Sequence, residues 1–314
     1  MIDYPLLVVP ALLMDHFLGE LPRFHPLVGF GRWAMRVEQR LYGSGEQSAI
    51  QRRGRGLLAV LWLLSLPVLV CGGLTAGDGW VGMGLHPVVL YLAIGGRSLR
   101  EHGMAVVQAM QTEGLAGARQ TVGLLVSRET GQMDESAVAR AAVESLLENG
   151  CDAIFGAIFW FLWLGAPGAL LYRLANTLDA LWGYRNDRYG SFGWAAARLD
   201  DLLNWIPARL TAITYLLAGH SRGAWRAWRG CRERKSPNAT LVMAVGAGAL
   251  GLRLGGEAVY HGRRVHNPFL GEGGAPTMRD IPRAVLLLRR SLLIWSVVSL
   301  ILGGGCWIFP CRLC

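Results

Sequence analysis

The chain has 314 residues, which is enough for one large domain or two modest ones. Hydrophobic residues make up 52% of it and charged residues only 17%, with a mean hydropathy of +0.32, which excludes an ordinary soluble domain and favours an integral membrane protein. On so apolar a chain, the net charge of +9 argues against a nucleic-acid partner and for topology signals, an anionic membrane surface or an anionic substrate.

The N-terminal region begins with an apolar stretch, Tyr4–Gly19, that contains two prolines and Asp15. These residues make it a poor clean span, so we expect a half-buried or re-entrant helix. A mixed, basic segment follows, in which His25 precedes a proline. A lone histidine is more often a hydrogen-bonded structural residue, but with Asp15 and Glu20 nearby it can also join a polar site.

Two membrane crossings are predicted next. Gly56–Leu74 carries no charge and is about long enough to span, and the arginines before it place its N-terminal end on the cytoplasmic side. Asp78–Gly96 follows a short glycine-rich turn, so we expect it to return across the membrane and to leave Arg97 and Arg100 in the cytoplasm.

Arg97–Asp152 is the one long hydrophilic segment. It contains three amphipathic stretches, "RSLREHGMAVVQAMQTEG", "EGLAGARQTVGLLVS" and "DESAVARAAVESLLENG". Asp134 or Ser136 is the expected N-cap of the third helix, and Asn149-Gly150 is its expected end. Together the three helices predict a small cytoplasmic helical subdomain.

The third of these helices carries two carboxylates on one face, because Glu144 and Glu148 are four residues apart. They lie toward the helix C-terminus, with Asp152 beyond, where acidic groups oppose the helix dipole and call for a compensating positive charge. The residues fit either a solvated face with an Arg140–Glu144 pair or a carboxylate cluster that binds Mg²⁺ or an amine. In the preceding "SRET" loop, Arg128 either clamps a phosphate or belongs to a structural turn.

Ala153–Leu174 is apolar but is interrupted by "GAPG", so it either crosses the membrane or re-enters it, and the break favours re-entry. The polar run that follows starts with Asn176 and Asp179, three residues apart. A helix is predicted from about Gly193 to Trp205.

That helix has a polar stripe opposite an apolar side. The stripe consists of Arg198, Asp200, Asp201 and Asn204. The apolar side consists of Leu199, Leu202, Leu203 and Ile206. The pattern fits an interfacial amphipathic helix, or an acid–amide face that holds Mg²⁺ and a phosphorylated ligand.

The remaining chain is expected to return to the membrane. His220–Pro237 carries six basic residues against one acidic residue, with two tryptophans as interface anchors, and is predicted to be a cytoplasmic juxtamembrane segment. A "SPN" cap, a small-residue helix over Asn238–Gly256, a loop over His261–Pro276 and a last span within Ala284–Pro310 follow. Because no strand alternation persists, the predicted class is all-α: a multi-pass helical membrane protein with four to six membrane segments. Residues 1–314 are expected to form a single membrane domain, with 97–152 and 175–205 as its polar parts.

Several stretches resemble one known family in family order. They are "HPLVGFGRW", "SRET", "DESAVARAAVESLLENGCDAIFGAIFW", "GALLYRLANTLDALWGYRNDRYGSFGWAAARLDDLLNWIPARLTA", "SPNATLVMAVGAGALGLRLGG" and "DIPRAVLLLRR". On these residues the chain resembles the CbiB/CobD family of cobalamin biosynthesis, adenosylcobinamide-phosphate synthase. The run starting "YRNDRYGSFGW" is the most specific, because it is long, polar and unusual in composition.

The resemblance implies a multi-pass inner-membrane enzyme with its active face in the cytoplasm. The family joins (R)-1-amino-2-propanol, or its O-phosphate, to the remaining propionate carboxylate of adenosylcobyric acid through an amide bond. ATP and Mg²⁺ are implied, since a carboxylate needs activation before an amine attacks it, and an acyl phosphate is the expected intermediate. The expected partners are the corrinoid, the aminopropanol phosphate, the membrane and other enzymes of the corrin pathway, with no nucleic acid.

Residue chemistry then suggests roles that family membership alone does not assign. The expected catalytic residues are Asp200, Asp201 and Glu144. The expected substrate- or phosphate-binding residues are Arg128, Arg185, Arg188, Asn176, Asn204 and His25. The expected metal ligands are Glu148, Asp152 and Asp179.

The chain also departs from the family pattern. Glu20 stands near the position of a family aspartate, and "ENGCD" replaces Glu-Asn-Thr-Ser-Asp. After the "SPNA" motif, where the family has Trp-Pro-Glu, the chain has Leu241, Val242 and Met243. The lost glutamate motivates the alternative of a catalytically inactive membrane accessory protein of the same pathway.

Overall fold

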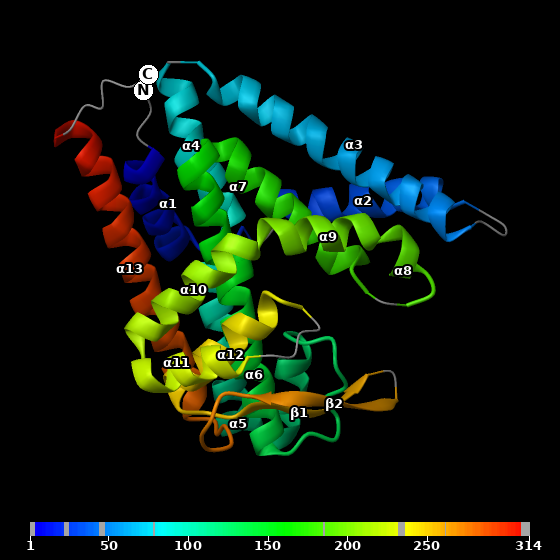
Figure 1. Ribbon diagram of the computed structural model, residues 1–314, viewed down its shortest axis with the longest axis vertical. Coiled ribbons are helices and arrows are strands. Elements are labelled where there is room, and N and C mark those ends of the chain that lie inside the picture. The colour runs from blue at the N-terminus through cyan, green and yellow to red at the C-terminus, as the bar shows by residue number, and fades with distance from the viewer. Residues whose placement is uncertain are drawn as a thin grey trace. The chain divides into compact units, whose positions relative to one another are not determined.

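The chain folds into two compact units built from helices, traced in the computed structural model of Figure 1. The structure describes residues 4–21, 25–43, 48–77, 79–184, 186–231, 236–260 and 262–308. Unit 1 comprises Met1–Gly95, Asp152–Asn204 and Val298–Cys314, and unit 2 comprises Gly96–Cys151 and Trp205–Val297. Arg185, a predicted phosphate-binding residue, lies outside the described residues.

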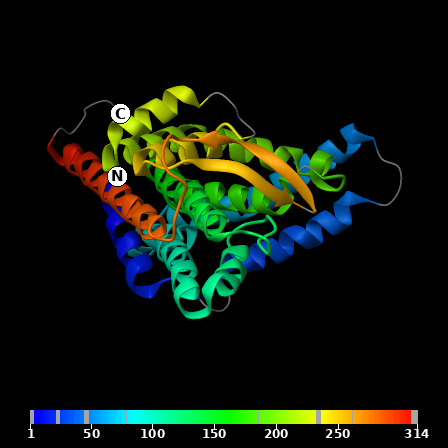
Figure 2. The ribbon, with the colours of Figure 1, turned by 90° about the horizontal axis from the view of Figure 1, so that it is seen from below.

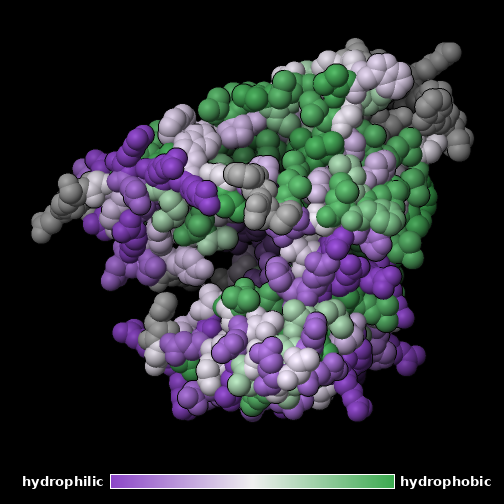
Figure 3. Space-filling view, turned by 180° about the vertical axis from the view of Figure 1, so that it is seen from behind, coloured by the Kyte–Doolittle hydropathy of each residue, from purple (hydrophilic) through white to green (hydrophobic). Residues whose placement is uncertain are grey.

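The predicted class, a helical integral membrane protein, is confirmed. Three helical runs are long and apolar enough to cross a membrane, namely Ala49–Thr75, Glu135–Trp182 and Asp280–Gly304. Large apolar side chains of the first run, among them Leu58, Trp62 and Leu69, are exposed, as lipid-facing residues are. Figure 3 shows hydrophobic residues gathered into broad areas on one face of the molecule, apart from the hydrophilic ones.

Unit 1 is organised around one broken helix, α7, against which α3, α4 and α9 pack. Its helices are α1 (Tyr4–Leu18), α2 (Pro26–Tyr42), α3 (Ala49–Thr75), α4 (Trp80–Ala93), α7 (Gly156–Trp182), α8 (Tyr189–Phe192) and α9 (Trp194–Leu203). A π-helical turn, η1 (Cys151–Phe155), leads into α7. The largest fully buried side chains of the unit include Phe161, Tyr172 and Trp182, so its core lies along α7.

Helix α7 reverses direction at Gly165, within the "GAPG" sequence. Gly165 has φ +63° and ψ −147°, which no helix contains. A Cβ on Gly168 would clash with the carbonyl oxygen of Trp160, and one on Gly156 would clash with the Tyr172 ring. Residues 156 and 172 would lie about 24 Å apart along a straight helix, so the two limbs of α7 must run back along each other. The predicted break is therefore confirmed, and it makes a helical hairpin of this apolar stretch.

Unit 2 contains the remaining helices and one β-hairpin. They are α5 (Gly96–Gly123), α6 (Glu135–Gly150), α10 (Trp205–Ala218), α11 (Ser221–Gly230), α12 (Ala239–Leu250), β1 (Leu254–Tyr260) and β2 (Arg263–Leu270). Helix α13 (Asp280–Ile308) begins in unit 2 and ends in unit 1.

The predicted helix boundaries in the hydrophilic segment are confirmed. Gly114, with φ +69°, divides α5 where the sequence separates two amphipathic stretches. Asp134 caps α6, since its carboxylate accepts from the Ala137 N–H at 2.7 Å. The end expected at Asn149-Gly150 is also confirmed, since α6 ends at Gly150, where the chain passes directly into η1.

The β-hairpin corrects the loop expected over His261–Pro276. Strands β1 and β2 pair antiparallel, with Tyr260 opposite Arg263 and Glu257 opposite His266. A register shift interrupts the ladder between Leu254 and Gly256. The hairpin lies across α6 in unit 2 (Figure 2). Its "LGG" start hides the strand from sequence patterns, because glycine is depleted in strands.

Candidate functional site

The most densely bonded polar group in unit 1 joins α7 to α9. The Asp200 carboxylate accepts from the amide nitrogen of Asn176 at 3.2 Å and from that of Asn204 at 3.2 and 3.1 Å. The Asn204 carbonyl oxygen in turn accepts from the Tyr172 hydroxyl at 2.7 Å. We call Tyr172, Asn176, Asp200 and Asn204 the acid–amide cluster. It brings together three of the predicted site residues, two of them 24 positions apart.

Helix α9 turns part of its polar stripe into the protein and part of it outward. Asn204 is only 2% exposed, whereas the Arg198 and Asp201 side chains are 60% and 30% exposed. Leu202, on the apolar side, is 71% exposed. The residues of α9 that are buried are Ala195, Ala196 and Leu203. In a protein surrounded by lipid, apolar side chains are stable on the outside and polar groups need partners inside, which fits the exposed Leu202 and the buried Asn204.

Burial perturbs the carboxyl group at the centre of the cluster. Desolvation raises the pKa of Asp200 above its ordinary value, although the hydrogen bonds from Asn176 and Asn204 act in the opposite direction. The nearby Asp201 charge raises it further. A carboxylate in such an environment is stabilised by binding a cation or by accepting a proton from a substrate. A raised pKa of this kind is typical of general bases.

Arg173 lies beside this cluster and was not singled out from the sequence. One guanidinium nitrogen lies 3.4 Å from the Asn176 carbonyl oxygen and 3.5 Å from the backbone oxygen of Asp152. Its Nε is buried and has no hydrogen-bond partner among the described residues. A buried guanidinium with an unsatisfied donor fits an anionic group of a ligand. The spacing of Arg173 and Asn176, three residues apart on one helix, was the available signal.

Asp201 and Arg188 are engaged elsewhere in unit 1. Asp201 pairs with Arg198 on the outer face of α9, at 3.4 Å, with both side chains partly exposed. Arg188 forms a two-pronged pair with Glu38, whose carboxylate is fully buried, at 2.9 and 3.1 Å. The charge of Glu38 raises the pKa of Arg188. The structure thus gives Arg188 a structural partner and leaves its predicted phosphate contact untested.

His25 occupies the structural position that was one of its two expected roles. Its Nδ1 accepts from the Leu27 N–H at 3.2 Å and caps α2. Burial lowers the pKa of His25, while the charge of Glu20 acts in the opposite direction. A lowered pKa favours the neutral ring, whose Nδ1 accepts the hydrogen bond of the cap.

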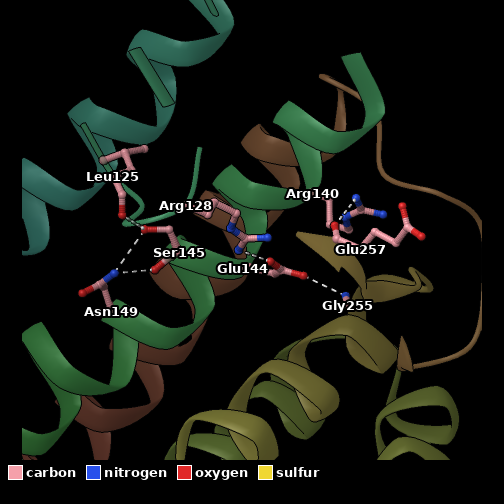
Figure 4. A network of polar contacts seen from close by, with 8 residues as sticks. All are labelled: Leu125, Arg128, Arg140, Glu144, Ser145, Asn149, Gly255 and Glu257. Carbon is pink, nitrogen blue, oxygen red and sulfur yellow. Dashed lines mark hydrogen bonds and ion pairs between the residues drawn. The ribbon is translucent and has the colours of Figure 1, made fainter. Parts of the chain in front are cut away.

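A second polar group forms in unit 2, where α6 meets the β-hairpin (Figure 4). The Glu144 carboxylate pairs with the Arg128 guanidinium through one oxygen and accepts from the Gly255 N–H at 2.7 Å through the other. Burial alone would lower the pKa of Arg128, but the charge and hydrogen bond of Glu144, together with the charges of Tyr260 and Glu148, outweigh burial and raise that pKa. Arg140, the expected partner of Glu144, donates at 3.5 Å to the Glu257 carbonyl oxygen. Glu144 therefore anchors the hairpin and orients Arg128.

These residues line a pocket of about 250 Å³, which we call the Arg128 pocket. Its polar lining residues are Arg128, Glu144, Glu148, Ser236, Thr240, Tyr260 and Asn267. Met243, which stands where the resembled family has a glutamate, also lines it. The hairpin supplies Tyr260 and Asn267, so the missed strands explain why sequence reasoning did not find them.

The three predicted metal ligands do not form one site. Among the described residues, no group of three or more His, Cys, Asp or Glu side chains could hold a metal ion. Glu148 lines the Arg128 pocket, Asp152 lies in η1, and Asp179 lies in the last turn of α7, where its backbone oxygen accepts from Gly183. Mg²⁺ is commonly bound by one or two carboxylates together with substrate phosphates. The separate carboxylates described here fit that kind of site rather than one formed by protein ligands alone.

Comparison with known proteins gives a consistent assignment. The family model described as "CobD/Cbib protein" matches residues 8–288. The chain is 53% identical over 293 residues to a protein of Chromobacterium violaceum named "Cobalamin biosynthesis protein CobD", covering 92% of this chain and 94% of the relative. A relative with the same name in Stutzerimonas stutzeri is 51% identical over 307 residues, covering 96% of this chain and 98% of the relative. Another in Mycobacterium tuberculosis is 38% identical over 293 residues, covering 90% of each.

No solved structure matches the chain. The family model spans most of both units, including the acid–amide cluster and the lining of the Arg128 pocket. The chain therefore belongs to the CobD/Cbib family.

Proposed function

We propose that this chain acts in cobalamin biosynthesis as an ATP-dependent acid–amine ligase. It would join (R)-1-amino-2-propanol, or its O-phosphate, to the propionate carboxylate of adenosylcobyric acid. Membership of the family supports the pathway, since the relatives are named for cobalamin biosynthesis. The amide-forming chemistry rests on the resemblance and on the residue chemistry described below.

The observation that carries the proposal is the acid–amide cluster with its buried arginine. Amide formation needs a base that accepts a proton from the attacking amine, and the raised pKa of Asp200 suits that role. Asn176 and Asn204 orient the carboxylate through their amide nitrogens. The unsatisfied Nε of Arg173 supplies a donor for an anionic group of the substrate.

ATP and Mg²⁺ would supply the activation that a carboxylate needs before an amine attacks it. In balanced form, the γ-phosphoryl group passes to the carboxylate and ADP leaves, then the amine displaces phosphate and the amide forms. Glu148 is the residue proposed to bind Mg²⁺ jointly with phosphate oxygens, because its carboxylate lines the Arg128 pocket. Arg128 adds a fixed positive charge for phosphate.

Complementation tests this function and separates two adjacent carboxylates. In a strain lacking its own synthase and supplied with cobyric acid, the wild-type gene should restore growth. Asp200→Asn should abolish rescue with normal protein in the membrane, because the cluster loses its charge. Asp201→Asn is the matched control, since Asp201 pairs outward with Arg198, and should rescue.

The opposite pattern, loss of rescue with Asp201→Asn and growth with Asp200→Asn, would assign the general base to Asp201 on the outer face of α9. Failure of the wild-type gene, with the protein present in the membrane, would favour the alternative of an inactive accessory protein. The position of Met243 in the Arg128 pocket motivates that alternative. In that case Met243→Glu is the variant expected to gain rescue.

A further inference from the structure

Helix α11 is an amphipathic helix pinned to α12 by its smallest residues. Gly223 and Gly248 approach so closely that a Cβ on either would clash with the carbonyl oxygen of the other. Ala224 and Ala227 complete the buried face. Such packing fixes the helix and determines which side chains point outward.

The outward face of α11 is basic and aromatic. Arg222, Trp225, Arg226 and Arg229 are exposed, Trp225 to 53%, and the helix contains no acidic residue. A hollow of about 480 Å³ is lined by His220, Arg222, Trp225 and Arg226. Glu272 lies 3.6 Å from Arg226, but both are exposed, and such pairs contribute little.

A further arginine reaches the start of this helix from α13. Arg290 donates at 3.3 Å to the backbone oxygen of Ala218, at the end of α10. The side chain is exposed, as is that of the adjacent Arg289. Positive charge from two helices therefore gathers at the junction of α10 and α11.

Exposed apolar side chains approach the same junction along both helices. On α10, Ile213 and Leu217 are exposed, Leu217 to 63%, and on α13 Leu293 and Val297 are exposed. Figure 1 shows α10, α11 and α13 near one another in unit 2. An apolar surface that ends in arginines and a tryptophan is the pattern of a membrane interface.

We propose that Arg222, Arg226 and Arg290, with Trp225, form a binding site for the phosphodiester headgroup of an anionic phospholipid. The arginines bind the phosphate, Trp225 lies at the headgroup level, and the acyl chains cover the exposed side chains of α10 and α13. The apolar flank selects a lipid over a soluble phosphate, which would leave that surface exposed to water. The site is independent of the proposed ligase chemistry.

The test uses the purified full-length protein in a neutral detergent, stripped of lipid. Binding of phosphatidylglycerol, phosphatidylcholine and inorganic phosphate is measured by native mass spectrometry. Wild type should bind phosphatidylglycerol at least tenfold more tightly than phosphatidylcholine. Arg222→Gln/Arg226→Gln should weaken phosphatidylglycerol binding by about fivefold for each charge removed.

The matched control is Arg263→Gln/Arg264→Gln, which removes two exposed charges from the hairpin of the same unit and should bind as wild type does. Arg222→Lys/Arg226→Lys keeps the charge and should retain the preference for phosphatidylglycerol, which covers the case in which the Gln variant does not fold. Equal binding of the two lipids, equal losses in the hairpin control, or displacement of phosphatidylglycerol by millimolar phosphate would each overturn the proposal.

Discussion

At the scale of single residues, the account depends on a carboxyl group whose neighbours are amides rather than cations. Asp200 is held by Asn176 and Asn204, so among the described residues its carboxylate has amide hydrogen-bond partners and no ion-pair partner. Asp201, one position away, faces an exposed arginine. The two residues share a sequence context and differ in environment.

The pH dependence of stability tests this difference. Burial places the folded-state pKa of Asp200 above its unfolded value, so between these pH values the native state holds a proton that the unfolded state has released. Stability from this group is present below the unfolded pKa and is lost as pH rises through the folded pKa. Asp200→Asn lacks that loss, so its melting temperature relative to wild type should rise as the pH increases above about 4, the ordinary pKa of an aspartate.

Melting of both proteins in detergent with a chelator present provides the measurement. Asp187→Asn, which changes an exposed carboxylate of the same unit, is the control and should show a constant difference. A constant difference for Asp200→Asn as well would contradict the buried position of that carboxyl group.

The Arg188–Glu38 pair makes a second prediction at this scale. Arg188→Gln leaves the fully buried Glu38 carboxylate without its guanidinium and should lower the free energy of unfolding by about 2 kcal/mol, less than for a pair buried on both sides. Arg198→Gln, which removes an exposed pair, should cost about 0.5 kcal/mol or less. Denaturant titration measures both. An unchanged stability with a raised KM for ATP would return Arg188 to its predicted phosphate-binding role.

At the scale of elements, turns and caps were predictable and tertiary partners were not. Gly114, Gly165 and Asp134 were located from local signals, because glycine breaks and polar caps depend on adjacent residues. The Glu144–Gly255 contact joins positions 111 apart, and no spacing rule reaches that far. The polar and apolar sides of α9 were predicted, but not which of its polar residues lie inside, because amphipathic patterns do not state whether water or lipid lies outside.

The β-hairpin gives a prediction for the Arg128 pocket. Gly255 has φ +81°, and a Cβ there would clash with the Pro268 carbonyl oxygen. Gly255→Ala should therefore displace the N–H that holds Glu144 and lower stability by about 1–3 kcal/mol. Hydrogen exchange should show faster exchange across residues 254–270.

Gly262→Ala is the matched control, because Gly262 also has a positive φ but no atom lies within 4 Å of the added Cβ. Gly262→Ala should lower stability through backbone strain alone and should keep the Gly255–Glu144 hydrogen bond. Equal exchange across the hairpin in the two variants would mean that Gly255 does not anchor it.

At the scale of the whole molecule, composition predicted a helical membrane protein, and the family match confirms the resemblance seen in the sequence. Residue spacing anticipated the Asp200–Asn204 contact, since four residues make one helical turn, but not the Asn176 partner, which the α7 hairpin positions. The pocket residues Tyr260 and Asn267 depended on a strand pair whose glycines conceal it. The sequence thus predicted which polar segments contribute to the candidate sites, but not the contacts between segments that lie far apart in the chain.

The central claim is that this chain forms the amide bond, and a reconstituted assay tests it most directly. Purified full-length protein is given adenosylcobyric acid, ATP, Mg²⁺ and either aminopropanol or its O-phosphate, and product mass and ADP release are followed together. The account predicts one amide product per ADP with wild type, and neither product nor corrinoid-dependent ADP with Asp200→Asn. Folded wild-type protein that releases no ADP and forms no product with either amine would contradict it.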